Sequence, residues 1–191
     1  MFNEPTRDPW CRMDFLQILF MNLAIVFLLI AVHETGHFLA GVTSGIPSGD
    51  MRIRLFSFPQ HVAIRDGDSW LSPANADEIQ RYIELTRRYF QSRAAAFRWV
   101  AGGVVVEAVF TVTVSVSAHL LGWSELAFWT ATMSLGMYFI NVFLMDLPWA
   151  LLHRHAFGDT SGLWTITKIS AVLLTLAMLL IRGGLLWYVA R

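Results

Sequence analysis

Two histidines in the first quarter of this 191-residue chain have the spacing of a metal site. His33 and His37 are four residues apart, and Glu34 directly follows the first of them. Residues four apart lie on one face of a helix, so both imidazoles can bind one ion. Zinc suits nitrogen ligands and lowers the pKa of a bound water to about 7. Glu34 would then accept the proton of that water, which is the chemistry of hydrolysis, most naturally of an amide.

The segment that carries these residues is long and apolar. Residues 15–42 are apolar except for Gln17, Asn22 and the cluster at 33–37, and about 20 apolar residues suffice to cross a bilayer. An ionisable residue at the centre of a spanning helix costs on the order of 2.5–3.5 kcal/mol, so such residues usually carry function. Three of them within five residues favour a metal site over coincidence.

A catalytic zinc normally has three protein ligands, so one more must come from elsewhere in the chain. Asp159 lies just before the last apolar stretch, on the membrane side where the first stretch ends, and Asp146 also qualifies. Either aspartate has an alternative role, since Asp159 could cap a helix, and Asp146 could end the third span or solvate the unsatisfied backbone near Pro148. We favour Asp159 and keep Asp146 as the alternative. The weaker candidates are Glu107, His119, His153 and His155.

The composition predicts a membrane protein, because 55% of the residues are hydrophobic and only 15% are charged. Spans are expected at 15–42, 94–121, 126–151 and 163–188. Residues 43–93 contain strand-like segments at 51–58 and 61–70, a turn at 66–68 and a polar helix at 75–92. We therefore predict an all-α polytopic membrane protein, one domain over 1–191, with four spans and a small strand-containing insertion after the first.

The charges indicate orientation more than partners. Lys plus Arg equals Asp plus Glu at 14 each, which gives no reason to expect nucleic acid as a partner. Arginines concentrate in 43–93, so we expect that loop on the cytoplasmic side. Acidic residues among 1–14 argue against a cleaved signal peptide, so the first span should be retained. Cys11 is the single cysteine, which excludes a disulfide framework or a multi-thiolate metal site.

Three blocks resemble the site-2 protease family of intramembrane zinc proteases. Residues 27–41, FLLIAVHETGHFLAG, and the strand-like segments after them resemble its zinc helix and membrane-associated β-loop. Residues 101–107 are similar to its Gly-Pro-x-x-Asn pattern, with Val104 and Glu107 at the proline and asparagine positions. Residues 141–148 and 159–164 resemble its Asn-containing helix and Asp-Gly sequence, with Thr160 at the glycine position.

The resemblance implies a function for each matching residue. His33, His37 and Asp159 would bind zinc, Glu34 would be the general base, and Asn141 would help to hold the substrate or transition state. The substrate would be a transmembrane or membrane-tethered protein, cut in or beside the bilayer, which for so small a chain suggests a bacterial cytoplasmic membrane. The short chain matches the core without a recognisable regulatory domain, so a regulatory or complex-forming membrane partner is expected.

Two other functions fit parts of the sequence. The altered second and third blocks, with eight tryptophans available for an interface, suit a protease-derived subunit that packs in a larger complex without catalysis. Glu34 argues against that reading, because a structural metal site does not require a general base. A metal transporter, or a hydrolase acting on a non-protein substrate, is the third hypothesis. Transporters usually have more spans in related halves, which this chain lacks.

Overall fold

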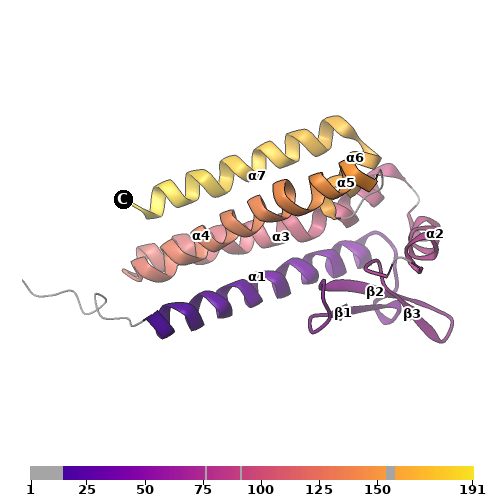
Figure 1. Ribbon diagram of the computed structural model, residues 1–191, viewed down its shortest axis with the longest axis horizontal. Helices are drawn as coiled ribbons and strands as arrows, with labels where there is room; N and C mark the ends of the chain where they lie inside the picture. Colours follow the sequence, from indigo (N-terminus) through magenta and orange to yellow (C-terminus); the bar gives the residue numbers. More distant parts are fainter. Residues whose placement is uncertain (1–14, 76, 91, 154–157) are drawn as a thin grey trace, which may run out of the picture.

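The computed structural model describes residues 15–75, 77–90, 92–153 and 158–191, with the side chain of His153 excluded. Four helical runs in this part of the chain are long and apolar enough to cross a membrane. They are α1 (Phe15–Thr43), α3 (Arg93–Leu120), α7 (Lys168–Val189) and a third run made of α4 (Ser124–Phe139), η3 (Ile140–Asp146) and α5 (Leu147–His153). Figure 1 shows them side by side. The predicted fold class, four spans with a strand-containing insertion after the first, is confirmed.

The third and fourth runs differ from the predicted spans in a way that matters for the site. The third was expected at 126–151, and within it η3 is π-helical up to Asp146, two residues before Pro148. Proline has no N–H and clashes with the carbonyl four residues earlier, so regular α-helical bonding cannot continue there. The fourth was expected to begin at 163. Instead α6 (Asp159–Ile166) is a separate helix, and Thr167, with φ −158° and ψ 111°, separates it from α7.

The insertion between α1 and α3 contains an antiparallel sheet in the order β1-β2-β3. Its strands are β1 (Met51–Arg54), β2 (His61–Asp66) and β3 (Ser69–Leu71), preceded by the short helix η2 (Ser48–Asp50). The first predicted strand segment was too long, because β1 ends at Arg54. The second is divided into β2 and β3 by the predicted turn, where Gly67 has a φ of +63°, a conformation that glycine adopts readily.

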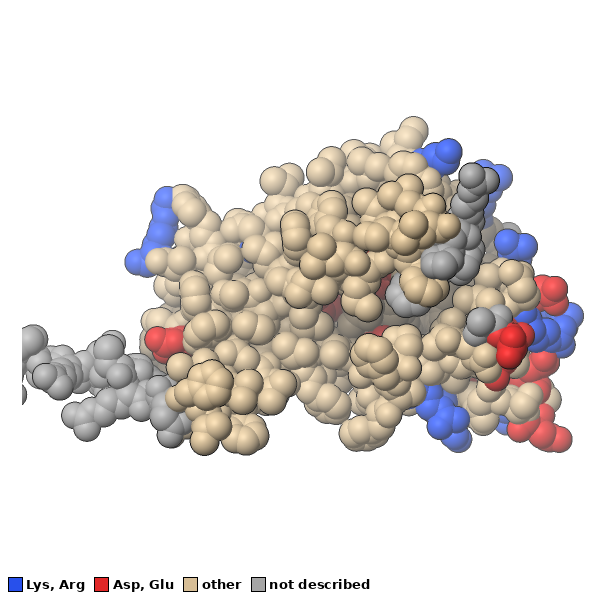
Figure 2. All heavy atoms as spheres, in the orientation of Figure 1, with Lys and Arg blue, Asp and Glu red and all other residues tan. Residues whose placement is uncertain are grey.

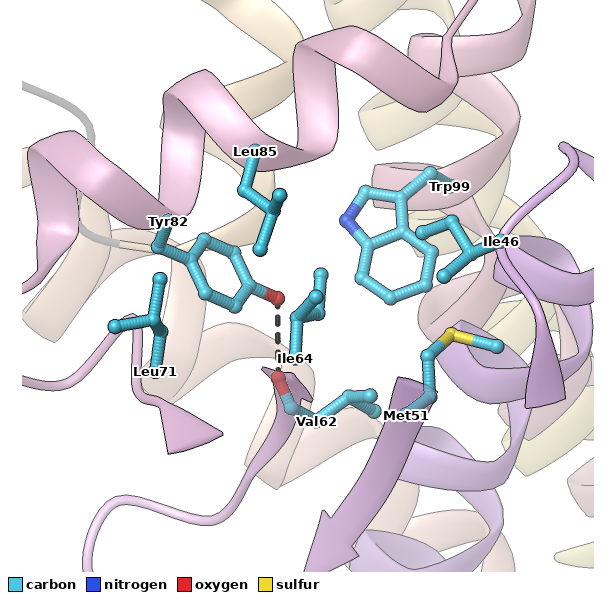
Figure 3. Packing of buried hydrophobic residues seen from close by; sticks show 8 residues of the cluster. All are labelled: Ile46, Met51, Val62, Ile64, Leu71, Tyr82, Leu85 and Trp99. Atoms are coloured by element: carbon cyan, nitrogen blue, oxygen red, sulfur yellow. Dashed lines mark hydrogen bonds between the residues drawn. The ribbon is translucent and has the colours of Figure 1, made fainter. Parts of the chain in front are cut away.

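Helix α2 (Ile79–Tyr89), shorter than the predicted 75–92, closes a small core over the sheet. Figure 3 shows this core, in which the Tyr82 hydroxyl donates a 3.0 Å hydrogen bond to the Val62 carbonyl. Trp99 of α3 packs into the same core, so the sheet is tied to the start of that helix. The buried members are Ile46, Met51, Val62, Ile64, Leu71, Tyr82, Leu85 and Trp99.

The surface has the polarity of a membrane protein. In Figure 2 charged side chains gather mainly at the end that carries the sheet and α2, and the middle of the molecule is largely free of them. Large apolar side chains face outward along the helices, for example Ile169 and Leu180 at 75% exposure each. Apolar surface this extensive requires an apolar solvent or a partner. Together with the four spans, it defines an integral membrane protein.

The loop after β1 lies beside the first span. Phe56 and Phe58 in this loop are 95% and 87% exposed. The ring of Phe56 lies 6.1 Å from that of Phe27, which is near the middle of α1. The β1–β2 hairpin therefore extends along the apolar helix toward its middle, and its exposed aromatic side chains suit hydrocarbon or the membrane interface.

Candidate metal centre

The structure brings together three of the residues singled out from the sequence: His33, His37 and Asp159. One turn of α1 separates the two histidines, and their Nε2 atoms are 3.1 Å apart. The Oδ2 atom of Asp159 lies 2.9 Å from Nε2 of His33 and 3.2 Å from Nε2 of His37. The three atoms form a nearly equilateral triangle between the end of α1 and the start of α6.

The backbone of α3 fixes the proton on one of these imidazoles. Nδ1 of His37 lies 2.9 Å from the carbonyl oxygen of Trp99. A carbonyl oxygen only accepts hydrogen bonds, so Nδ1 must carry the proton and donate it. In the neutral ring, Nε2 is then unprotonated and presents its lone pair to His33 and Asp159. A backbone carbonyl that orients a histidine in this way is a common feature of metal sites.

The donor set fits a divalent cation such as zinc. Tetrahedral bonds of about 2.0–2.1 Å separate neighbouring ligand atoms by about 3.3 Å, close to the three distances seen here. Two imidazole nitrogens and a carboxylate oxygen are also a ligand set that zinc takes in catalytic sites. When both imidazoles are neutral, the lone pair of His37 and the carboxylate of Asp159 both face inward, and one proton on His33 cannot satisfy both acceptors. A cation bound between them would accept the lone pairs of both imidazoles and pair with the carboxylate.

The same contacts control the charge of the aspartate. Burial alone would raise the pKa of Asp159, but the positive charge that His37 and His33 carry when protonated, together with their hydrogen bonds, holds this pKa well below its usual range. The carboxylate is therefore ionised at neutral pH, as a metal ligand must be.

Asp146, the alternative third ligand, has a different partner. Its side chain is buried and accepts hydrogen bonds from the backbone N–H groups of Gly158, at 3.1 Å, and Ser161, at 2.9 Å. These N–H groups belong to the first turn of α6, where a helix has no internal partner for them. Asp146 thus anchors the N-terminus of α6 to the end of η3. This contact holds Asp159, the first residue of α6, opposite the histidines.

The other residues considered as ligands or catalytic groups lie outside the triangle. Glu34 is buried at 7% exposure and directly follows His33, whereas Asn141 is exposed on η3. Glu107 forms an ion pair with Arg182 of α7, and His119 packs against Tyr188 near the far end of α3. His155, like Cys11, lies outside the described residues, as does the side chain of His153.

Glycines let α3 approach the metal-binding face of α1. A Cβ atom on Gly36 would overlap the carbonyl oxygen of Gly102 and lie 2.9 Å from the Cα atom of Gly103. A Cβ atom on Gly103 would overlap Nε2 of His37 and lie 2.7 Å from Nε2 of His33. Small residues allow this kind of close helix crossing in membranes. Gly103 therefore forms the floor of the triangle.

Adding one methyl group at this floor should weaken metal binding. We expect Gly103→Ala to lower zinc affinity by about tenfold or more, because both imidazoles must move from positions the metal requires and supporting contacts are typically worth 10–100-fold. Gly136→Ala is the matched control, since a Cβ atom there has nothing within 4 Å. Zinc titration of both purified variants against a competing chelator measures the effect. Equal affinities for the two variants would contradict it.

Sequence reasoning missed the residues that position the ligands. The carbonyl of Trp99 acts through the backbone, which no side-chain pattern reveals. Asp146 was considered only as a rival ligand or as a residue serving the backbone near Pro148, not as the cap that orients Asp159. Gly36 indicated a close backbone approach, but the adjacent pair Gly102 and Gly103, which supplies the other side of the crossing, was not recognised.

Comparison with known proteins gives no family assignment: no family model, curated protein or solved structure matches this chain.

Proposed function

We propose that this chain is an intramembrane zinc metalloendopeptidase of the site-2 protease type, which cleaves transmembrane or membrane-tethered proteins. The observation that carries the proposal is the convergence of His33, His37 and Asp159 on one point, from helices far apart in sequence. Glu34 directly follows His33 and is buried in the same apolar span. Four charged or ionisable groups within an apolar bundle are expensive unless they act together.

Each residue has a defined part in this mechanism. His33, His37 and Asp159 would hold the zinc, which when bound supplies Lewis acidity toward a carbonyl and a water of lowered pKa. Glu34 would take the proton of the attacking water and return it to the leaving amine. Burial of Glu34 at 7% exposure excludes bulk water, which strengthens its interactions with charge at the centre.

The surroundings favour a substrate that reaches the site from the membrane. Figure 2 shows a hollow in the middle of one face, with acidic atoms visible at its bottom and mainly uncharged residues around its rim. A transmembrane helix would have to unwind before its backbone could reach such a site, because its amides are hydrogen-bonded internally. An extended segment could pair with an edge of the small sheet, where β1 and β3 each have one strand neighbour.

The proposal is tested by the purified protein and its Glu34→Gln variant in detergent or nanodiscs. The wild type should contain about one zinc per chain and cleave candidate membrane substrates. Glu34→Gln should retain zinc while cleavage falls by about a hundredfold or more, the usual contribution of a general base. Chelation should abolish cleavage by the wild type, and added zinc should restore it.

Two outcomes would reject the proposal. One is a wild type without metal, and the other is a cleavage activity that Glu34→Gln shares. Zinc in both proteins with no cleavage by either would favour the second candidate, a protease-derived membrane subunit without catalysis. The exposed position of Asn141 and the ion-paired state of Glu107 favour this second candidate, because neither residue reaches the triangle.

A further inference from the structure

A row of polar side chains runs along α3 away from the candidate metal centre. The members of this row are four residues apart, so each lies about one helical turn beyond the one before it. They are Glu107, Thr111, Ser115 and His119. The row spans about 18 Å along the helix, at 1.5 Å per residue. Thr111 and Ser115 are completely buried, and His119 lies at the last turn of α3, near the membrane face opposite the metal centre. The rest of this helix beyond Gly103 is largely apolar.

At its inner end the row meets polar groups from two other helices. Glu107 accepts hydrogen bonds from Thr111 at 3.0 Å and from Ser134 of α4 at 2.6 Å, and it pairs with Arg182 of α7. Arg182 also donates a 3.0 Å hydrogen bond to Ser134. Arg182 is 1% exposed, which makes it the largest fully buried side chain among the described residues. A polar network therefore occupies the centre of the α3, α4 and α7 bundle.

Three atoms along this network have hydrogen-bonding capacity that no described residue uses. They are Oγ of Ser115, Nδ1 of His119 and Nη1 of Arg182, all inaccessible at the protein surface. A buried polar group without a hydrogen bond is unfavourable, and for the Arg182 guanidinium the ring of Tyr138, 4.4 Å away, supplies an electrostatic contact but no acceptor oxygen. His119 and Ser115 lie along the row, and Arg182 lies at its inner end. An imidazole, a hydroxyl and a cation in this order suit a small ligand that can both donate and accept hydrogen bonds. Water has this property and bridges buried polar groups in many proteins.

We propose that a water-bearing track runs from the membrane face at His119 to the buried Glu107–Arg182 pair. It is formed by Glu107, Thr111, Ser115, His119, Ser134 and Arg182. The track ends one helical turn from Gly103, the floor under the two histidines. It therefore approaches the candidate metal centre from the opposite side of the membrane to α6. The proposal does not depend on the metal or on catalysis.

Accessibility of single cysteines to aqueous silver ion tests the track. In a Cys11→Ser background, Ser115→Cys places a thiol on the track, and Ala118→Cys places one three residues further along the same helix in an apolar cluster. Both positions are buried. Proteoliposomes are treated with silver, quenched, denatured and labelled with a fluorescent maleimide. We expect silver to block Ser115→Cys at least tenfold faster than Ala118→Cys.

A second pair of cysteine variants keeps the test decisive if a variant of the first pair does not fold. Thr111→Cys on the track is compared with Ala108→Cys, which packs in an apolar cluster three residues earlier. Equal silver rates within a folded pair would overturn the proposal and leave the network as a purely structural clamp. Adding His119→Leu to Ser115→Cys should slow the silver reaction by fivefold or more. An unchanged rate would refute entry at His119. Neither result depends on zinc or on proteolysis.

Discussion

Asp159→Asn is expected to lower zinc affinity by more than about a hundredfold. The substitution keeps the shape of the side chain but removes the negative charge that two imidazoles share, so only two strong ligands remain. Loss of a supporting residue alone typically costs 10–100-fold, and loss of a direct ligand should exceed that. The measurement is zinc retained by the purified variant during dialysis against a chelator of known affinity.

Asp146→Asn is the matched control, because it makes the same chemical change at a buried carboxylate that contacts the same loop. One oxygen remains to accept an N–H from Gly158 or Ser161, so α6 should loosen without losing its ligand. We expect zinc affinity to fall by no more than about tenfold, in the range of supporting contacts. If Asp146→Asn released zinc and Asp159→Asn retained it, the assignment of the third ligand would be reversed.

Removing one member of the Glu107–Arg182 pair is expected to destabilise the fold by about 3–5 kcal/mol, because the other charge is left buried without a partner. Arg182→Met and Glu107→Leu should each show this loss. The double variant should recover most of it, because replacing both charges with apolar groups removes the desolvation cost. Unfolding by increasing SDS in mixed micelles, followed by circular dichroism, gives the free energy of unfolding for each protein.

The control for these single and double variants is Lys168→Met. Lys168 is the other basic residue of α7, but it begins the helix and lies 5.9 Å from the ring of Trp164 at the surface. Its loss should change the free energy of unfolding by no more than about 0.5 kcal/mol. Single variants as stable as Lys168→Met would show that the pair contributes little to the fold.

Much of the architecture could be predicted from the sequence because membrane spans are defined by composition over long windows. Residues 15–42 matched α1 (Phe15–Thr43) to within one residue. The predictions were wrong where one residue overrode the general pattern. Pro148 changed the helical type of the residues before it, and the extended backbone at Thr167 separated α6 from α7.

The candidate site was predictable to the extent that it is local. His33, Glu34 and His37 lie within one and a half turns of a single helix, so their spacing alone predicts a shared direction. Asp159 is 122 residues beyond His37, and only the fold determines that they meet. The sequence offered two candidate aspartates, of which Asp159 was favoured and Asp146 was the alternative. Their different roles depend on which one faces the backbone N–H groups of α6, a three-dimensional property.

The crossing of α1 and α3 at Gly36 and Gly102 limits how anything can enter the centre. The two backbones touch where the histidines project, and neither helix has a side chain there that could rotate aside as a gate. Separating them would pull His37 from the Trp99 carbonyl and Gly103 from beneath both rings, so opening on this side would dismantle the centre. Under the proposed function, a polypeptide substrate would therefore have to reach the centre from a side other than this helix crossing.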